Sequence, residues 1–254
     1  MQICFLNTKI YYSILKSKPN NSFINTKWIV FLHGWGCDGN IFTNFAKQLI
    51  SHANKHLVQN LKCLLVDFPP FGKSEQPKST WSLQTYVNLI KRLLLNLNIK
   101  SADFVCHSFG GRVAICLASE NTKIVNKLVL CASAGIKPKH MLLNKIKIAK
   151  YKFLKKYCPQ KCKKMGSTDW KNLSPIMKHT FSNIIGEHLE NYAKKISNST
   201  LLIWGNLDTD TPPFMAKKLL KLIKNSGIVW LNGGHFTIFE NFYITCAVLK
   251  KFLL

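Results

Sequence analysis

The chain has 254 residues, of which 47% are apolar and 19% charged, and this balance excludes a disordered chain and a collagen-like one. A chain of this length can bury enough surface to hold a core without disulfides or a structural metal. No apolar stretch approaches the ~20 residues that a membrane-spanning helix needs. Residues 1–7 lack the basic start and the apolar region of a signal peptide, so we expect a soluble, cytoplasmic protein.

The formal net charge is +25, and Arg92 and Arg112 are the only arginines, so nearly all the cations are lysines. A charge of this size is typical of proteins that bind nucleic acid or anionic membranes. The sequence contains no motif of a nucleic-acid-binding module, and arginine, the usual reader of bases, is nearly absent. We therefore expect no dedicated nucleic-acid binding and only weak association with anionic surfaces.

The nine cysteines are scattered along the chain. Cys158 and Cys162 form a single Cys-x3-Cys pair, with no second pair at the spacing of a zinc site. We interpret all nine as reduced thiols and expect no metal and no other cofactor.

Short apolar runs bounded by Gly, Pro, Asn and Asp alternate with longer helical patterns. The runs predict strands at residues 10–15, 28–32, 63–66, 103–106, 128–131, 201–204 and 228–231. Apolar spacing near 3.6 predicts helices at residues 83–95 and 110–119 and in the tail 236–254. This alternation predicts an α/β fold, in which a mostly parallel sheet carries helices on both faces.

Residues 136–199 interrupt this rhythm with helical patterns, Lys/Asn-rich joints and no clear strand. We expect residues 1–135 and 200–254 to form the core. Residues 136–199 are predicted to be an all-helical cap, inserted before the last two strands and placed over one end of the sheet.

Ser108 lies between a predicted strand and a predicted helix, in the segment Cys-His-Ser-Phe-Gly-Gly at residues 106–111. A nucleophile on such a turn is exposed at the carboxyl end of the sheet and needs small neighbours. The segment departs from G-x-S-x-G because Cys106 replaces the first glycine. Taken alone, the segment could also be an ordinary turn with a surface serine.

A nucleophilic serine needs a base, and the base needs an orienting carboxylate. Asp208 follows the strand at 201–204, and His235 ends the glycine-containing run after the strand at 228–231. Three strand ends thus supply Ser, Asp and His in that order, which predicts a catalytic triad. Asp210 competes with Asp208, which we favour because it is nearer the strand end. The loop at 132–137 contains no acid that could serve instead.

The Gly34-Trp35-Gly36 turn follows the strand at 28–32. We predict that the backbone N–H groups of Trp35 and Phe109 form an oxyanion hole. His33 and His107 are expected to be structural, and five further histidines are expected at the surface or in the cap: His52, His56, His140, His179 and His188.

With these motifs, the chain resembles the α/β-hydrolase superfamily over nearly its full length, through residues 33–36, 67–74, 107–111, 205–208 and 234–235. Residues 133–138 and 166–170 are similar to uncharacterised bacterial hydrolases related to meta-cleavage-product C–C hydrolases and to BioH-type esterases. The resemblance implies an eight-stranded sheet, a helical lid and a Ser–His–Asp triad, but no particular substrate.

The function predicted first is a serine hydrolase that cleaves a carboxylic ester or related acyl compound, so that the partner is a small molecule. The alternatives are a C–C bond hydrolase of the meta-cleavage-product type, and a ligand-binding module on a hydrolase scaffold. Predicted substrate-binding residues are Trp170, Ile136 and Met141. The sequence gives no indication of the oligomeric state.

Overall fold

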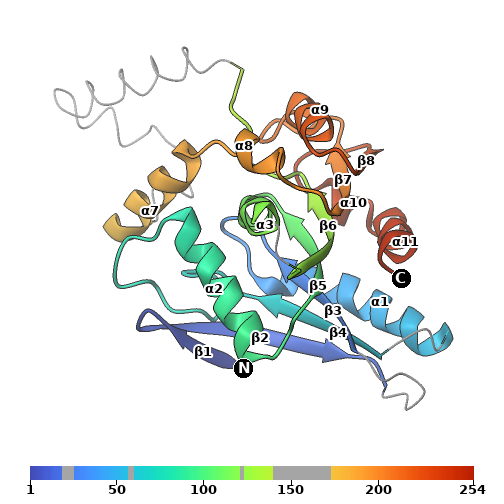
Figure 1. Cartoon of the computed structure of the whole chain (residues 1–254), viewed down its shortest axis with the longest axis horizontal. Coiled ribbons are helices and arrows are strands. Elements are labelled where there is room, and N and C mark those ends of the chain that lie inside the picture. The colour runs from blue at the N-terminus through green and yellow to red at the C-terminus, as the bar shows by residue number, and fades with distance from the viewer. Residues whose placement is uncertain (19–25, 57–59, 121–122, 140–172) are drawn as a thin grey trace.

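The computed structural model of the chain describes residues 1–18, 26–56, 60–120, 123–139 and 173–254 (Figure 1). The Cys158–Cys162 pair and the predicted substrate-binding residues Trp170 and Met141 lie outside the described residues. Within the described residues, no helix combines the length and the apolar character that crossing a bilayer requires.

Eight strands form one sheet in the order β1-β2-β4-β3-β5-β6-β7-β8. β1 pairs antiparallel with β2 and β2 with β4, whereas all the other neighbours are parallel. The predicted fold class, an α/β-hydrolase fold with a mostly parallel eight-stranded sheet, is confirmed. The strands are β1 Gln2–Phe5, β2 Thr8–Lys16, β3 Thr26–Leu32, β4 Asn60–Val66, β5 Ala102–His107, β6 Val125–Cys131, β7 Ser199–Gly205 and β8 Ser226–Leu231.

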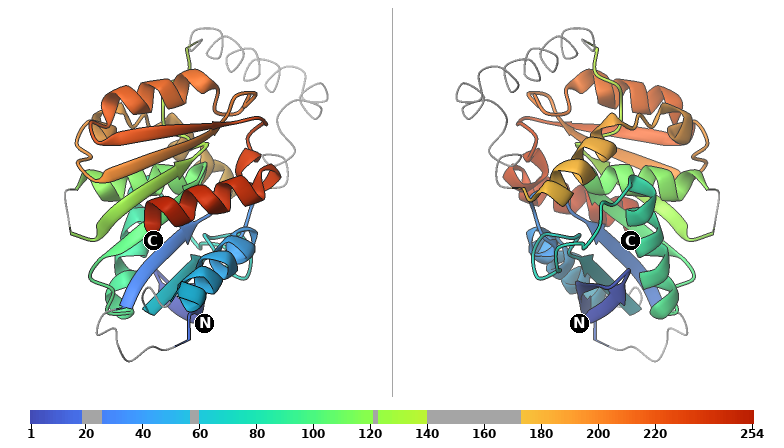
Figure 2. Two further views of the ribbon diagram at one scale, coloured as in Figure 1. Left: turned by 90° about the vertical axis from the view of Figure 1, so that its right-hand side faces the viewer. Right: turned by 90° about the vertical axis from the view of Figure 1, so that its left-hand side faces the viewer.

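Helices cover both faces of the sheet because alternate side chains of each buried strand point to opposite sides (Figure 2). One face carries α2 (Leu83–Asn96), α3 (Phe109–Ser119) and α9 (Pro213–Leu222), and α8 (Glu190–Ala193) packs on α3 and α9. The other packs against α1 (Thr43–His56), α10 (Thr237–Glu240) and α11 (Phe242–Leu253). Helix α1 is preceded by the 3₁₀ turn Gly39–Phe42.

The structure differs from the predicted elements at both ends of the chain. β1 was not predicted, because four residues with an exposed, half-buried alternation form only a short edge strand. The strand predicted as buried at 228–231 corresponds to β8, where Trp230 is 39% exposed because β8 is an edge strand of the sheet. The tail at 236–254 is two helices rather than one. The break falls at Asn241, whose side-chain amide donates to the carbonyl oxygens of Asn232 and Thr237.

The parallel strands bring several loops to one edge of the sheet. β3, β5, β6, β7 and β8 are neighbours in that order, and all five run in the same direction. The loops that follow them, which contain Trp35, Ser108, Asp208 and His235, therefore lie at the same carboxyl edge.

Helix α7 (Pro175–Gly186), in the described part of the predicted cap, contacts the loop that contains Trp35 and the loop that follows β4. The backbone N–H of Trp81 donates to the Thr180 hydroxyl over 3.0 Å, and the rings of Trp35 and Phe181 lie 5.0 Å apart. The division of the chain into a core and a cap at 136–199 stays a prediction.

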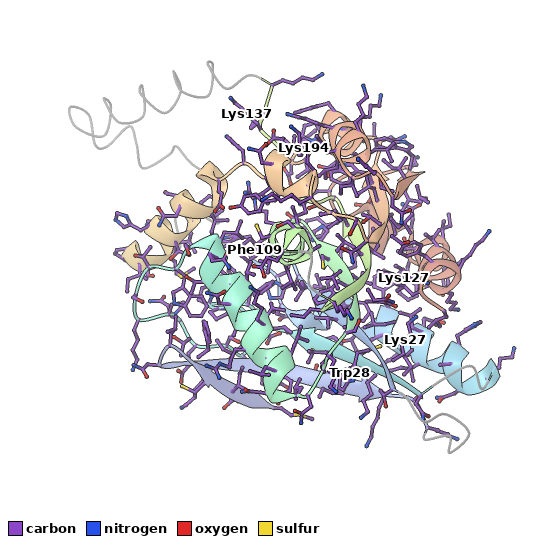
Figure 3. The ribbon with its side chains drawn as sticks, viewed as in Figure 1. Lys27, Trp28, Phe109, Lys127, Lys137 and Lys194 are labelled. Atoms are coloured by element: carbon purple, nitrogen blue, oxygen red, sulfur yellow. The ribbon has the colours of Figure 1, made fainter. Side chains whose placement is uncertain are left out.

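The end of α11 is attached to the opposite, amino edge of the sheet. Lys27, on β3, donates to the carbonyl oxygen of Leu253, and Lys127, on β6, donates to that of Phe252 over 2.6 Å (Figure 3). Lys27 also pairs with the buried carboxylate of Asp103 at 3.0 Å. Two lysines thus satisfy carbonyl groups that the last helical turn leaves without partners.

Candidate active site

Ser108 occupies the turn between β5 and α3 in a backbone conformation that L-residues rarely adopt. Its φ is +49° and its ψ is −107°. Two hydrogen bonds fix this conformation: the Ser108 N–H donates to the carbonyl of Cys131 (3.0 Å), and its carbonyl accepts from the N–H of Ala134 (3.1 Å). Backbone strain of this kind persists only where surrounding structure enforces it, and it concentrates at functional sites. The local geometry is that of a nucleophile elbow.

Small residues make this turn possible. An ideal Cβ on Gly110 would lie 2.2 Å from the carbonyl oxygen of Leu32, so α3 approaches β3 closely only because this residue is glycine. Cys106, in place of the first glycine of the motif, is completely buried at the end of β5. Burial, assisted by the nearby Cys131, raises the pKa of the Cys106 thiol well above its usual value. This thiol is therefore a packed core residue and not a competing nucleophile.

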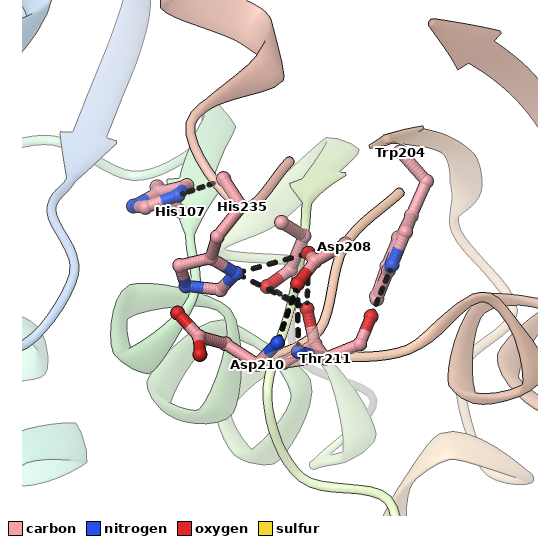
Figure 4. A network of polar contacts seen from close by, with 7 residues as sticks. His107, Trp204, Asp208, Asp210, Thr211 and His235 are labelled. Carbon is pink, nitrogen blue, oxygen red and sulfur yellow. Dashed lines mark hydrogen bonds and ion pairs between the residues drawn. The ribbon is translucent and has the colours of Figure 1, made fainter. Parts of the chain in front are cut away.

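Asp208 and His235 form a hydrogen-bonded pair at the ends of β7 and β8 (Figure 4). His235 Nδ1 lies 2.9 Å from Asp208 Oδ2. Asp208 Oδ1 accepts from the backbone N–H groups of Asp210 and Thr211, each over 2.9 Å, and the Thr211 hydroxyl lies 2.8 Å from Oδ2. Both carboxylate oxygens are held, so the Asp208 side chain can orient the imidazole of His235.

The same contacts fix the charge of Asp208. Burial alone would raise the pKa of Asp208, but the hydrogen bonds from His235 and Thr211 outweigh burial and hold the pKa below its usual value. Asp208 is therefore a carboxylate at neutral pH, and its acceptor oxygen requires that Nδ1 of His235 carry a proton. The neutral imidazole then presents an unprotonated Nε2, which is the form that a general base needs.

The two candidate acids of this loop are clearly distinguished. The Asp208 side chain is fully buried against His235, whereas Asp210 is exposed and contributes only its backbone N–H to Asp208. Asp210 instead belongs to the wall of the cavity described below.

His33 and His107 both act through hydrogen bonds to backbone groups. His33 Nδ1 lies 2.7 Å from the Gly34 carbonyl, and its Nε2 accepts from the N–H of Phe68 over 2.7 Å, which fixes the turn that carries Trp35. His107 Nε2 lies 3.0 Å from the carbonyl oxygen of His235 (Figure 4). Burial, and then the nearby His235, lowers the pKa of His107 to about 3, so its ring is neutral and donates from Nε2.

A cavity of about 350 Å³ opens beside Ser108 and His235. Its wall is largely apolar, with a few polar and charged groups, as in sites for small organic ligands. The described residues that line it are Trp35, Ser108, Phe109, Arg112, Ala134, Gly135, Ile136, Pro138, Phe181, Ile184, Ile185, His188, Asp210, Thr211, Met215 and His235.

The backbone N–H groups of Trp35 and Phe109 belong to residues of this cavity wall. In the described part of the chain, neither donates a hydrogen bond to another residue, whereas the next N–H along α3, that of Gly110, donates to the His33 carbonyl over 3.0 Å. Two donors at the carboxyl edge of the sheet are thus left for a ligand.

Residues 27–157, just over half of the chain, match the family described as alpha/beta hydrolase fold. The chain belongs to this family. YugF, an uncharacterised hydrolase of Bacillus subtilis, is 29% identical over 205 residues, which cover 68% of this chain and 72% of YugF. A 2-hydroxy-6-oxononadienedioate/2-hydroxy-6-oxononatrienedioate hydrolase of Cupriavidus pinatubonensis is 25% identical over 251 residues. The match covers 87% of this chain and 85% of that protein. The similarity to meta-cleavage-product hydrolases is thus a distant one.

The solved structure of the esterase EaEST from Exiguobacterium antarcticum superposes with a TM-score of 0.72 at 19% identity, covering 96% of this chain and 95% of that one. At this identity the likeness establishes the alpha/beta hydrolase fold, and the chemistry must be argued from the site itself.

The cavity wall contains Ile136, a predicted substrate-binding residue, together with residues that the sequence did not single out for this site. His188, which was expected at the surface or in the cap, lines it as well, and Arg112 and Phe181 were not considered for it. The spacing of Arg112, one helical turn after Ser108, was a usable signal for that residue. Phe181 and His188 carried no such signal, because their position depends on how α7 and α8 pack.

Proposed function

We propose that this alpha/beta hydrolase is a serine hydrolase that cleaves a carboxylic ester or a related acyl compound. The observation that carries the proposal is one cavity wall that combines Ser108 on a strained turn with His235, whose Nδ1 is bound to the buried carboxylate of Asp208. An apolar cavity beside a nucleophile and a base suits an acyl group of small or medium size.

In the proposed reaction, Ser108 Oγ attacks the substrate carbonyl while His235 Nε2 takes its proton. The resulting oxyanion is stabilised by the N–H groups of Trp35 and Phe109, and by the N-terminus of α3, which starts directly after Ser108. His235 then gives the proton to the leaving alcohol, which leaves an acyl group on Ser108. A water molecule, deprotonated by His235, attacks the acyl group, and the proton returns to Ser108 as the acid departs. Asp208 orients the imidazole and stabilises its charged form throughout.

The test is covalent labelling with a fluorophosphonate probe, followed by intact-mass measurement and an ester hydrolysis assay. We expect one adduct on the wild type and none on Ser108→Ala, with a fall in kcat of about 10⁴-fold or more. Ser79→Ala, which changes an exposed serine outside the cavity, is the matched control and should label and hydrolyse as the wild type does. An unlabelled wild type without activity on any ester would contradict the proposal and favour a ligand-binding role.

A second candidate is hydrolysis of a C–C bond in a ring-cleavage product. The observation that favours it is the similarity, over 87% of this chain, to the Cupriavidus pinatubonensis hydrolase named above. Turnover of a 2-hydroxy-6-oxo-dienoate faster than of any simple ester would favour this reaction, and the reverse order would favour ester hydrolysis.

A further inference from the structure

Arg112 places a buried positive charge in the cavity wall. It lies on α3 one helical turn after Ser108, and only 7% of its surface is exposed. Among the described residues that line the cavity, it is the only Lys or Arg, although the chain contains 36 of these cations. Of the two arginines in this lysine-rich chain, one therefore lies at the candidate active site.

The guanidinium group of Arg112 has only part of its hydrogen-bonding capacity filled. Its Nη1 donates to the carbonyl oxygens of Ile184 (2.9 Å) and Glu187 (2.8 Å), at the end of α7. A guanidinium carries five N–H bonds, so the three on Nε and Nη2 have no partner among the described residues. No described carboxylate lies within 4.0 Å of this group.

A buried cation that no carboxylate contacts directly is costly unless a ligand supplies that contact. Burial lowers the pKa of Arg112 to about 10, while Cys116 and the Glu187 carboxylate, which lies beyond 4.0 Å, act in the opposite direction, so the side chain remains charged at neutral pH. The remaining N–H groups on Nε and Nη2 form a planar fork, and a carboxylate is the anion that matches such a fork with two parallel hydrogen bonds.

We propose that Arg112 binds a carboxylate carried by the acyl part of the substrate while Ser108 attacks the acyl carbonyl. This inference rests on the proposed function and names a substrate class for it, the monoesters of dicarboxylic acids. The negative charge of Asp210 in the cavity wall supports placing the substrate carboxylate on the acyl part. Asp210 belongs to the loop that contacts His235, where the leaving group must receive its proton, and it would repel an anion there.

The kinetic test uses mono-4-nitrophenyl esters of succinic, glutaric and adipic acid, each compared with a neutral 4-nitrophenyl ester of equal chain length. For at least one length, Arg112→Gln should lower the ratio of kcat/KM for the anionic ester to that for the neutral ester by about ten-fold or more. Arg112→Lys keeps the charge but loses the planar pair of donors, so its ratio should lie between those of the wild type and Arg112→Gln. Arg92→Gln removes the other, exposed arginine and should leave the ratio unchanged.

A purely structural role for Arg112 gives a different result. If Arg112 only holds the end of α7, its substitution should slow both kinds of ester equally and leave the ratio at the wild-type value, which overturns the proposal. If the variants fail to fold, the kinetics of the wild type on the two kinds of ester still test the proposal. Neutral esters hydrolysed at least ten-fold better than the anionic ester at every chain length would likewise overturn it.

A binding measurement separates this inference from the proposed function. Calorimetry with glutarate on Ser108→Ala protein needs no catalysis, and binding should weaken about ten-fold or more when Arg112→Gln is added. If the protein is neither labelled nor active on esters but still binds glutarate through Arg112, the proposed hydrolase function is refuted and the carboxylate site at Arg112 is supported. If it hydrolyses neutral esters but does not bind glutarate, the hydrolase function is supported and the carboxylate site is refuted.

Discussion

His107 joins the serine turn to the histidine loop through a single hydrogen bond. Its Nε2–H donates to the carbonyl oxygen of His235 over 3.0 Å, and its ring centroid lies 4.9 Å from that of His235. His107 directly precedes Ser108 in the sequence. One side chain therefore connects the backbone positions of the proposed nucleophile and the proposed base.

Loss of this hydrogen bond should lower the rate of the chemical step more than substrate binding. We expect His107→Leu, which removes the donor, to reduce kcat about ten-fold with little change in KM, because His235 loses its anchor near Ser108. His107→Gln keeps an N–H donor at similar reach and should recover most of the lost rate. Steady-state kinetics on one ester, with both variants compared at equal folded fraction, provide the measurement. Equal losses in the two variants would show that packing, not the hydrogen bond, is what matters.

At the scale of single residues, the sequence was most informative where chemistry restricts the residue type. Only Asp208 and Asp210 follow β7, and nearness to the strand end favoured Asp208, the residue that lies beside His235 in the structure. Thr211, which fixes the Asp208 carboxylate, was not singled out. Its Asp-x-x-Thr spacing is a local side-chain-to-backbone pattern that could have been recognised. The assignment of catalytic roles to these residues stays a prediction.

At the scale of elements, the contact between α3 and β3 sets the position of the serine turn. Gly110→Ala would place a methyl group 2.2 Å from the carbonyl oxygen of Leu32. The new methyl group is fixed to the backbone of α3 and the carbonyl to that of β3, so neither can move without displacing its element. We therefore expect a loss of more than about 3 kcal/mol in the free energy of unfolding, or displacement of α3. Urea unfolding measures the first effect, and fluorophosphonate labelling reports the second.

Gly186→Ala is the matched control for this substitution. Gly186 ends α7 and has nothing within 4 Å of an added Cβ, so this change should be neutral or slightly stabilising. A Gly110→Ala protein that is as stable and as readily labelled as Gly186→Ala would contradict the close approach of α3 to β3.

The sequence predicted the buried strands and the helices α2 and α3, but it missed two regular helices, α1 and α9, and the elements whose form depends on tertiary contacts. β5 and β6 are apolar runs bounded by turns, and α2 has a clear helical period. The division between α10 and α11 depends on the side-chain contacts of Asn241, which no period reveals. Similarly, β1 is a strand because the turn at Leu6 and Asn7, both with positive φ, folds it onto β2.

At the scale of the whole molecule, stability should depend on pH through two buried histidines. Burial lowers the pKa of His33, and burial together with His235 lowers that of His107 to about 3. Below pH ~6.5 the unfolded chain binds protons on these side chains that the folded chain does not bind. The free energy of unfolding should therefore fall with decreasing pH, by about 1.4 kcal/mol per pH unit for His107, and His33 should add a fall in the same direction.

Urea unfolding at pH 7, 6 and 5 tests this dependence before most carboxylates are protonated. His107→Gln removes one of the two groups and should give a slope shallower by about 1 kcal/mol per pH unit. His179→Gln, on the exposed side of α7, should keep the wild-type slope. Identical slopes in the wild type and His107→Gln would contradict a neutral, buried His107.

Charge is distributed unevenly over the molecule in a way that composition could not predict. Lys137 and Lys194, labelled in Figure 3, are exposed, whereas Arg112 is buried and lines the cavity. The net charge of +25 was available from the sequence, but the placement of one cation beside Ser108 depends on the start of α3 and on the end of α7. Location in the cytoplasm and weak association with anionic surfaces remain predictions from the sequence.

The attachment of α11 by Lys27 and Lys127 has a practical consequence for how the protein can be handled. These contacts hold the Leu254 end at the amino edge of the sheet, away from the carboxyl edge where the cavity opens. A linker that immobilises the protein through this end would therefore leave the cavity facing the solution. Such a surface-bound protein would accept substrates from the medium without steric hindrance from its support.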